Sequence, residues 1–176
     1  MSEYFEVNID KTDIREEELQ SLAISLVSAM KKSKLTFASA ESCTGGLIGG
    51  VITSASGSSD IYSGGIITYT NDVKIGVLGV DKKLIDEYTE VSFCVAEDMA
   101  RNVREKLCAD IGVSATGYAG PTGGTEKDPI GTVYVGVSCG DSEKAFRLSF
   151  KNGVGRQEIR LMVVEFVLSK LLLICV

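Results

Sequence analysis

The chain has 176 residues, of which 44% are hydrophobic and 24% charged, with only two prolines. This length and composition predict one globular domain over residues 1–176 and exclude a disordered chain. The formal net charge of −6 argues against a protein that binds nucleic acid or an anionic membrane surface, because both need an excess of Lys and Arg.

The absence of histidine limits the catalytic mechanisms that are open to this chain. The chain has no histidine, which excludes Ser-His-Asp and Cys-His catalysis and removes the commonest ligand of catalytic zinc. A general base must therefore be a lysine, a tyrosine, a carboxylate or a water held by one of them. The five cysteines form no C-x-x-C pair, which is typical of reduced thiols in a cytoplasmic protein and not of disulfides or a zinc site.

We expect neither a targeting signal nor a membrane-spanning segment at the two ends of the chain. The first residues are acidic and lack the pattern of a signal peptide. Arg160, Glu165 and Lys170 interrupt the apolar carboxy-terminal stretch, and burying three charges in hydrocarbon would be costly. We therefore expect a cytoplasmic protein with no membrane partner, whose apolar last helix is compatible with a homo-oligomer.

The hydrophobic pattern predicts alternating helices and strands. The expected elements are a helix over 19–30 capped by Thr12 or Asp13, a strand over 35–40, a helix over 45–53, a strand over 63–69, helices over 71–77, 82–88 and 92–107, strands over 111–118, 132–138 and 144–150, and a helix over 156–173. The last three strands are closely spaced and must pair antiparallel. The order predicts an α/β fold, a three-layer α/β/α sandwich with a mixed sheet.

Residues 40–46, Ala-Glu-Ser-Cys-Thr-Gly-Gly, lie at an expected strand-to-helix junction. Unpaired N–H groups and the positive helix end favour an anion there, which makes Ser42 a candidate nucleophile. Alternatively, Ser42 or Thr44 caps the helix and the glycines serve packing. Cys43 is a rival nucleophile, although such a thiol is more often a small buried apolar side chain.

The segment from Tyr69 to Lys74 supplies two candidate proton acceptors. If Asn71 is a helix N-cap, Lys74 falls at the third helical position, where the helix dipole lowers a lysine pKa. A fall from about 10.4 to about 7.5 corresponds to about 4 kcal/mol, most of which burial or another cation must supply. Alternatively a charged Lys74 stabilises a Tyr69 phenolate, or both are ordinary surface residues.

Two further segments have the composition of an anion site. Residues 115–125 are rich in glycine, so their N–H groups could hold a phosphate, although the P-loop pattern is absent and a surface turn has the same composition. Arg156 opens the last helix, where its charge opposes the helix dipole, but its planar fork suits a phosphate or carboxylate. An exposed arginine without function fits this position equally well.

Three motifs together closely resemble the CinA carboxy-terminal domain family, whose members include nicotinamide mononucleotide deamidases. They are AESCTGG at 40–46, GGIITYTNDVK at 64–74 and ATGYAGPTGGTEKDPIGTV at 115–133, in the order and spacing of the family. The resemblance extends from about Glu17 to Leu173. Asp128 stands where family members commonly have lysine. Many relatives carry an additional amino-terminal domain, for which we expect this chain to be too short.

The resemblance implies hydrolysis of nicotinamide mononucleotide to nicotinic acid mononucleotide and ammonia, a step in pyridine-nucleotide salvage. It implies that Ser42, Tyr69 and Lys74 are catalytic and that no metal or organic cofactor is used. The expected partner is a small nucleotide, with no nucleic acid involved. The expected substrate-binding residues are Glu41, Cys43, Thr44, Gly45, Thr116, Gly117, Gly120 and Arg156.

The hypothesis is an acyl-enzyme mechanism. Ser42 attacks the carboxamide, Lys74 and Tyr69 move its proton, and helix-end N–H groups hold the oxyanion. Arg156 and backbone donors near Thr116 hold the phosphate. The alternatives are a nucleotide-binding module without catalysis and a hydrolase of another small amide or ester. A short-chain dehydrogenase is disfavoured, because no glycine fingerprint follows the first strand.

Overall fold

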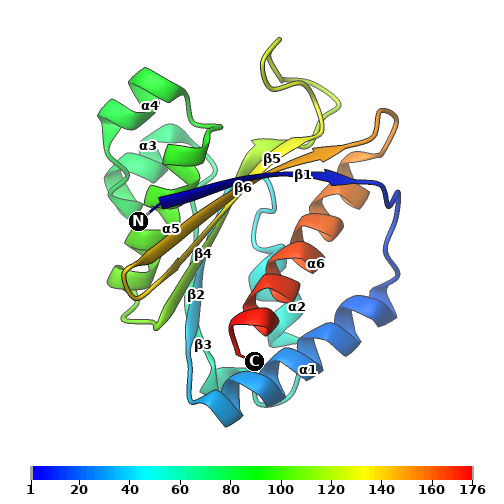
Figure 1. Cartoon of the computed structure of the whole chain (residues 1–176), viewed down its shortest axis with the longest axis vertical. Helices are drawn as coiled ribbons and strands as arrows, with labels where there is room; N and C mark the ends of the chain where they lie inside the picture. Colours follow the sequence, from blue (N-terminus) through cyan, green and yellow to red (C-terminus); the bar gives the residue numbers. More distant parts are fainter. Residues whose placement is uncertain (1, 176) are drawn as a thin grey trace.

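The computed structural model describes residues 2–175, which form a six-stranded sheet with helices on both faces. The strands are β1 (Ser2–Ile9), β2 (Phe37–Glu41), β3 (Tyr62–Ile67), β4 (Ile111–Tyr118), β5 (Thr132–Cys139) and β6 (Ser142–Phe150). The helical segments are α1 (Glu16–Ser33), α2 (Leu47–Thr53), the 3-10 helix η1 (Ser58–Asp60), α3 (Asn71–Val73), the π-helical turn η2 (Lys74–Leu78), α4 (Lys82–Tyr88), α5 (Phe93–Lys106) and α6 (Arg156–Ile174). Figure 1 shows α1, α2 and α6 on one side of the sheet and α3, α4 and α5 on the other. The expected three-layer α/β/α sandwich is confirmed.

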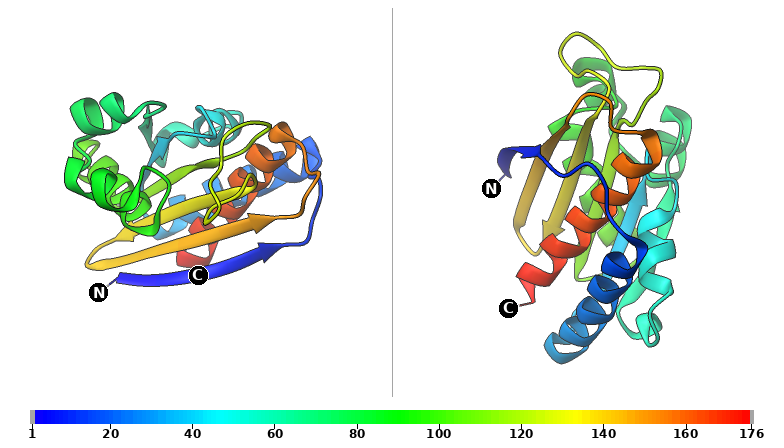
Figure 2. Two further views of the ribbon diagram at one scale, coloured as in Figure 1. Left: turned by 90° about the horizontal axis from the view of Figure 1, so that it is seen from above. Right: turned by 90° about the vertical axis from the view of Figure 1, so that its right-hand side faces the viewer.

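The sheet is mixed, with the strand order β1-β6-β5-β4-β2-β3. β2 lies in the parallel part, between β3 and β4, while β4, β5 and β6 pair antiparallel and β1 runs parallel to β6 at the edge. The chain leaves β2 through α2 on one face, and leaves β3 through α3, α4 and α5 on the other (Figure 2). Connections that diverge in this way open a crevice at the carboxyl ends of parallel strands.

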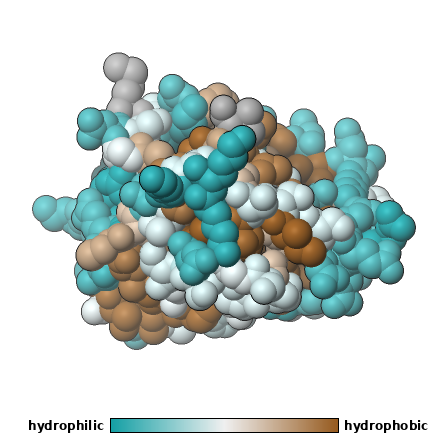
Figure 3. Space-filling view, turned by 90° about the horizontal axis from the view of Figure 1, so that it is seen from below, coloured by the Kyte–Doolittle hydropathy of each residue, from teal (hydrophilic) through white to brown (hydrophobic). Residues whose placement is uncertain are grey.

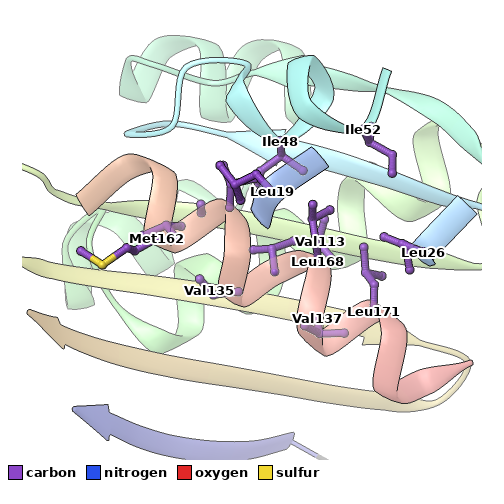
Figure 4. Packing of buried hydrophobic residues seen from close by; sticks show 14 of the residues in the cluster. Leu19, Leu26, Ile48, Ile52, Val113, Val135, Val137, Met162, Leu168 and Leu171 are labelled. Atoms are coloured by element: carbon purple, nitrogen blue, oxygen red, sulfur yellow. The ribbon is translucent and has the colours of Figure 1, made fainter. Parts of the chain in front are cut away.

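The larger core fills the space between the sheet and α1, α2 and α6. Figure 4 shows Leu26, Ile48, Val113 and Leu168 pointing into this layer, and all four side chains are completely buried. Full burial of such a side chain stabilises the fold by about 1.5 to 3 kcal/mol. This layer fixes α2 and α6 against the sheet, and with them the turn that follows β2.

The other face of the sheet packs against α5. Val95, Met99 and Val103 recur at helical spacing and are completely buried. Ser92 caps this helix, as expected, since its hydroxyl accepts a hydrogen bond from the Val95 N–H at 3.4 Å. α5 therefore holds the segment before it, residues 89–92, against the carboxyl end of β4.

The amino-terminal part differs from the expectation. The sequence pattern predicted no strand before the first helix, whereas residues 2–9 form β1. The expected cap at Thr12 or Asp13 is wrong, because α1 begins at Glu16 and follows Arg15, whose side chain makes no capping hydrogen bond. Glutamates at the first three positions of α1 interact favourably with the positive helix end instead.

Some apolar side chains remain at the surface. Ile24 and Leu173 are exposed, and Figure 3 shows hydrophobic and hydrophilic surface side by side on one face of the molecule. Scattered exposed apolar residues are normal on a globular surface. Within residues 2–175, no helix combines the length and apolar character needed to cross a bilayer.

Candidate active site

A cavity of about 410 Å³ opens at the carboxyl ends of β2, β3 and β4, at the crevice that the topology predicts. The residues that line it are Ser42, Cys43, Tyr69, Asn71, Lys74, Glu90, Val91, Thr116, Gly117, Tyr118, Ala119, Thr122 and Arg156. All three motif segments of the sequence contribute to this lining. The structure thus brings together seven of the expected site residues: Ser42, Cys43, Tyr69, Lys74, Thr116, Gly117 and Arg156.

The end of β2 is held by both neighbouring strands. The Ser42 N–H donates to the Ala115 carbonyl of β4 at 2.9 Å, and the Thr68 N–H donates to the Glu41 carbonyl at 2.7 Å. Ser42 is therefore the first residue beyond a strand that is anchored on both sides. Its hydroxyl has a defined position at the cavity wall, and its residue is only 8% exposed.

The Glu41 carboxylate is bound by backbone N–H groups, and Glu41 does not line the cavity. Its carboxylate accepts hydrogen bonds from the backbone N–H groups of Gly46, Ile48 and Gly49, at 2.9, 3.1 and 3.0 Å. Because these are N–H groups of the first turn of α2, Glu41 caps this helix from five residues upstream. The expectation that helix-end N–H groups are free to hold an oxyanion is therefore corrected for these three.

The second helix also begins later than expected. It starts at Leu47, because Gly45 and Gly46 adopt left-handed φ angles of +60° and +97°. Only glycine adopts such angles without strain, so the two glycines form the turn that brings the chain from Ser42 into α2. Neither Ser42 nor Thr44 caps the helix.

Lys74 makes the contact on which the chemistry depends. Its Nζ donates hydrogen bonds to Ser42 Oγ at 3.0 Å and to the Thr68 carbonyl at 2.9 Å, and the residue is only 1% exposed. Burial lowers the pKa of Lys74 below its usual 10.5, while the negative charge of Glu90 partly opposes this shift. A lysine amine with a lowered pKa beside a serine hydroxyl is a serine–lysine pair that can transfer a proton.

The helix dipole contributes less to Lys74 than the sequence predicted. The N-cap is Thr70, whose hydroxyl accepts from the Val73 N–H at 3.4 Å, and not Asn71. Lys74 is therefore the fourth helical residue, at the edge of the range over which a helix end acts. Burial is the main cause of its shifted pKa.

Tyr69 lies in the same cavity but outside the serine–lysine contact. Its side chain is 61% exposed, and its hydroxyl accepts a hydrogen bond from Arg156 Nη2 at 3.4 Å. Within residues 2–175 it makes no hydrogen bond to Ser42 or Lys74. The geometry thus favours Lys74 over Tyr69 as the group that receives the serine proton.

Arg156 lies at the first position of α6, as predicted from the sequence, and lines the cavity. Its Nη1 donates to the Gly120 carbonyl at 2.6 Å, so Gly120 positions the arginine and does not itself line the cavity. The guanidinium has five N–H donors, of which the contacts with Gly120 and Tyr69 use two. Donors therefore remain for an anionic ligand.

Cys43, Thr44 and Gly45 form the turn after Ser42, and a second arginine of α6 holds it. Arg160 donates from Nε to the Cys43 carbonyl at 3.1 Å and from Nη2 to the Thr44 carbonyl at 2.7 Å. Burial raises the pKa of the Cys43 thiol to about 12, which suppresses the thiolate. Thr44 is completely buried, and neither Thr44 nor Gly45 lines the cavity.

The glycine-rich segment forms part of the cavity wall. Thr116 and Gly117 line the cavity at the end of β4, and the Thr116 hydroxyl donates to the Glu90 carbonyl at 2.8 Å. Asp128, at the base of the loop, is buried and accepts from the Tyr134 hydroxyl at 2.8 Å and from Arg147 Nε at 3.0 Å. This cluster anchors the loop to the sheet, which gives Asp128 a structural role.

Several residues of the site were not predicted from the sequence. Glu90, Tyr118 and Thr122 line the cavity, and Arg160 holds the turn that follows the nucleophile. Arg160 sits one helical turn after Arg156, a spacing that places both guanidinium groups on one side of α6. No group of three or more metal-ligating side chains occurs within the described residues 2–175.

Comparison with known proteins identifies one matching family and several similar proteins. A family model described as the CinA C-terminal domain matches residues 19–175. A CinA-like protein of Salinibacter ruber is 51% identical over 122 residues, which cover 69% of this chain and 30% of that protein. A CinA-like protein of Nostoc punctiforme is 47% identical over 132 residues, covering 74% and 32% respectively. The chain spans about a third of the length of the curated relatives it matches.

Solved structures share the fold. The competence/damage inducible protein CihA from Agrobacterium tumefaciens superimposes with a TM-score of 0.84 at 33% identity, covering 92% of this chain and 96% of that one. A competence-damaged protein (CinA) superfamily protein from Escherichia coli gives 0.84 at 29% identity, covering 94% and 93%. These matches extend over almost the whole α/β/α sandwich.

Proposed function

The chain belongs to the CinA C-terminal domain family, and from this premise we propose that it hydrolyses the carboxamide of nicotinamide mononucleotide to nicotinic acid mononucleotide and ammonia. Family members include enzymes with this activity. The observation that carries the proposal is the 3.0 Å contact between Lys74 Nζ and Ser42 Oγ at the wall of the cavity. A nucleotide-binding module without catalysis has no need of a buried amine beside a serine hydroxyl.

The first step forms an acyl-enzyme. Neutral Lys74 accepts the Ser42 proton as Oγ attacks the carboxamide carbon, and the Thr68 carbonyl orients the amine. The C–N bond of the tetrahedral intermediate then breaks, and the protonated Lys74 gives its proton to the departing nitrogen. Ammonia leaves, and the nicotinoyl group remains as an ester on Ser42.

The second step returns the enzyme to its starting state. Water attacks the ester carbon while Lys74 accepts its proton, and the bond to Oγ breaks as that proton passes to the serine. Nicotinic acid mononucleotide is released, and one water is consumed for each ammonia formed. Lys74 serves as the base in each addition and as the acid in each elimination.

The oxyanion has candidate donors in the turn after Ser42. In the part of the chain that the structure describes, the backbone N–H groups of Cys43 and Thr44 donate no hydrogen bond to another residue, unlike those of Gly46, Ile48 and Gly49. Arg160 fixes this turn by donating hydrogen bonds to the carbonyls of Cys43 and Thr44. Donors held in advance stabilise a developing oxyanion without the cost of reorganisation.

The phosphate would bind Arg156, which keeps free N–H donors and lines the same cavity as the serine–lysine pair. A guanidinium recognises a phosphate with two parallel hydrogen bonds. The cavity volume of about 410 Å³ is that of a site for a small organic ligand. An acidic protein can attract an anionic substrate in this way, because the charge of the pocket matters more than the net charge.

An ammonia-release assay with nicotinamide mononucleotide tests the proposal on wild type, Ser42→Ala and Cys43→Ala. We expect wild-type activity, loss of at least a thousandfold in kcat for the serine variant, and activity within about threefold of wild type for the cysteine variant. The reverse pattern would make Cys43 the nucleophile. Binding without ammonia release would indicate a nucleotide-binding module, and faster turnover of simple esters or other amides would indicate a different hydrolase.

A further inference from the structure

Glu90 is one of the residues that line the catalytic cavity. It is the acidic residue among the described residues that line the cavity, which also include the two basic residues Lys74 and Arg156. Its backbone is well anchored, because its carbonyl accepts from the Thr116 hydroxyl and Ser92, two residues later, caps α5. The backbone position from which this half-buried side chain extends is therefore fixed.

The Glu90 carboxylate has no hydrogen-bond or ion-pair partner within residues 2–175. Other carboxylates of similar or greater burial do: Glu41 is bound by backbone N–H groups, Asp128 by Tyr134 and Arg147, and Glu143 by Arg101. The charge of Glu90 nevertheless acts inside the cavity, since it opposes the fall that burial causes in the pKa of Lys74 and adds to the rise that burial causes in the pKa of Tyr118. An unpaired carboxylate whose charge acts on two residues of the cavity lining is available to a ligand.

The charges of the cavity match those of the proposed substrate. Nicotinamide mononucleotide carries a permanent positive charge on its ring nitrogen and a negative phosphate at its other end. Arg156 suits the phosphate, and Lys74 must be neutral to accept a proton from Ser42. Glu90 remains as the anion that can face the ring, in the same cavity as the lysine and serine that attack the carboxamide of that ring.

We infer that Glu90 is a specificity residue that selects a cationic ring over a neutral ring of the same shape. The inference rests on the proposed function for the identity of the substrate. Recognition of this kind acts on binding, because the ring is cationic in the substrate and stays cationic in the acyl-enzyme and the product. For one charge pair about 5 Å apart, partly screened by solvent, the expected effect on affinity is about tenfold.

The test compares two ligands that differ in ring charge alone. One is nicotinamide mononucleotide, and the other is the C-nucleotide in which a neutral benzamide ring replaces nicotinamide and the ribose phosphate is kept. Calorimetry measures both dissociation constants on a Ser42→Ala background, where substrate is not consumed. The variants are Glu90→Gln, Glu90→Asp and, as a control for net charge, Glu87→Gln at an exposed carboxylate of α4 outside the cavity lining.

We expect Glu90→Gln to raise the dissociation constant of the cationic nucleotide about tenfold and to leave that of the neutral one within twofold. Glu90→Asp should keep part of the preference, and Glu87→Gln should change neither value. Equal changes for both ligands would overturn the inference, since they would assign Glu90 to the ribose or to the protonation of Lys74. Unchanged values for both ligands would overturn it as well.

This outcome is separate from that of the proposed function. Wild type that binds the cationic nucleotide without releasing ammonia would refute the hydrolysis, while the ratio of the two dissociation constants would still decide the role of Glu90. Wild type that releases ammonia, with a ratio unaffected by Glu90→Gln, would refute the inference alone. Absence of binding by either nucleotide, together with absence of ammonia release, would refute both.

Discussion

A Lys74→Met variant removes the amine that contacts Ser42 while keeping an unbranched side chain in a site that is only 1% exposed. A positioned general base contributes about a hundredfold to ten-thousandfold to a rate, equivalent to about 3 to 5 kcal/mol of activation free energy. We therefore expect kcat for ammonia release to fall by at least a hundredfold. The KM for the nucleotide should change little, because the amine acts in proton transfer and not in ground-state binding.

The same variant has a predictable effect on stability. It loses two hydrogen bonds, to Ser42 Oγ and the Thr68 carbonyl, each worth about 1 kcal/mol net. It also removes the unfavourable burial of an amine, which acts in the opposite direction. We expect the free energy of unfolding from urea denaturation to stay within about 2 kcal/mol of wild type, so that the loss of activity is not a loss of fold.

Lys83→Met is the matched control, because Lys83 is exposed on α4 and lies outside the cavity lining. It should keep wild-type kcat and KM. The reasoning would be refuted if Lys74→Met, folded by circular dichroism, kept kcat within tenfold of wild type. Tyr69 or a bound water would then have to be the proton acceptor.

Three further predictions follow from the same contacts. Burial lowers the pKa of Lys74, so kcat/KM should rise with pH as this amine loses its proton, with a midpoint below 10.5. The penalty of burying the amine should fade as pH rises towards that value. A kcat/KM that falls as the pH rises from 6 to 9.5 would contradict a neutral Lys74 as the base. Arg160→Ala should lower kcat about tenfold with a smaller effect in Arg160→Lys, since Arg160 holds the carbonyls of Cys43 and Thr44; steady-state kinetics with unchanged kcat would show that the turn needs no such support. Glu41→Gln should lower the free energy of unfolding by about 2 to 4 kcal/mol, because an amide cannot accept from all the N–H groups that the carboxylate binds; an unchanged melting temperature would contradict this capping role.

Much of the fold follows from local patterns that the sequence displays. The strand predicted over 111–118 agrees with β4 at both ends, and Asp81 caps α4 with a hydrogen bond from the Lys83 N–H at 2.9 Å. These elements are set by side-chain periodicity and by one capping residue, both of which are local. β1 is different: it is an edge strand in which acidic residues such as Glu3 and Glu6 are exposed, so its burial pattern is weak and its pairing with β6 is distant in sequence.

The site was predictable where its residues lie in motifs, and less so where they meet across the fold. Ser42 and Lys74 are 32 residues apart, and only the parallel pairing of β2 with β3 brings their segments together. Glu90 gave no signal, since a glutamate before a helix cap has the composition of a surface turn. Arg160 resembles any charged residue on a helix until the position of α6 beside the turn after β2 is known.

Partitioning with hydroxylamine tests the central claim most directly. Wild type is incubated with nicotinamide mononucleotide and hydroxylamine, and the hydroxamate of the nucleotide is measured beside nicotinic acid mononucleotide. An ester on Ser42 predicts that hydroxamate forms at the expense of acid in wild type and Cys43→Ala, and is absent in Ser42→Ala. Hydrolysis that continues with no hydroxamate at high hydroxylamine, or hydroxamate that persists in Ser42→Ala, would contradict a covalent role for this serine.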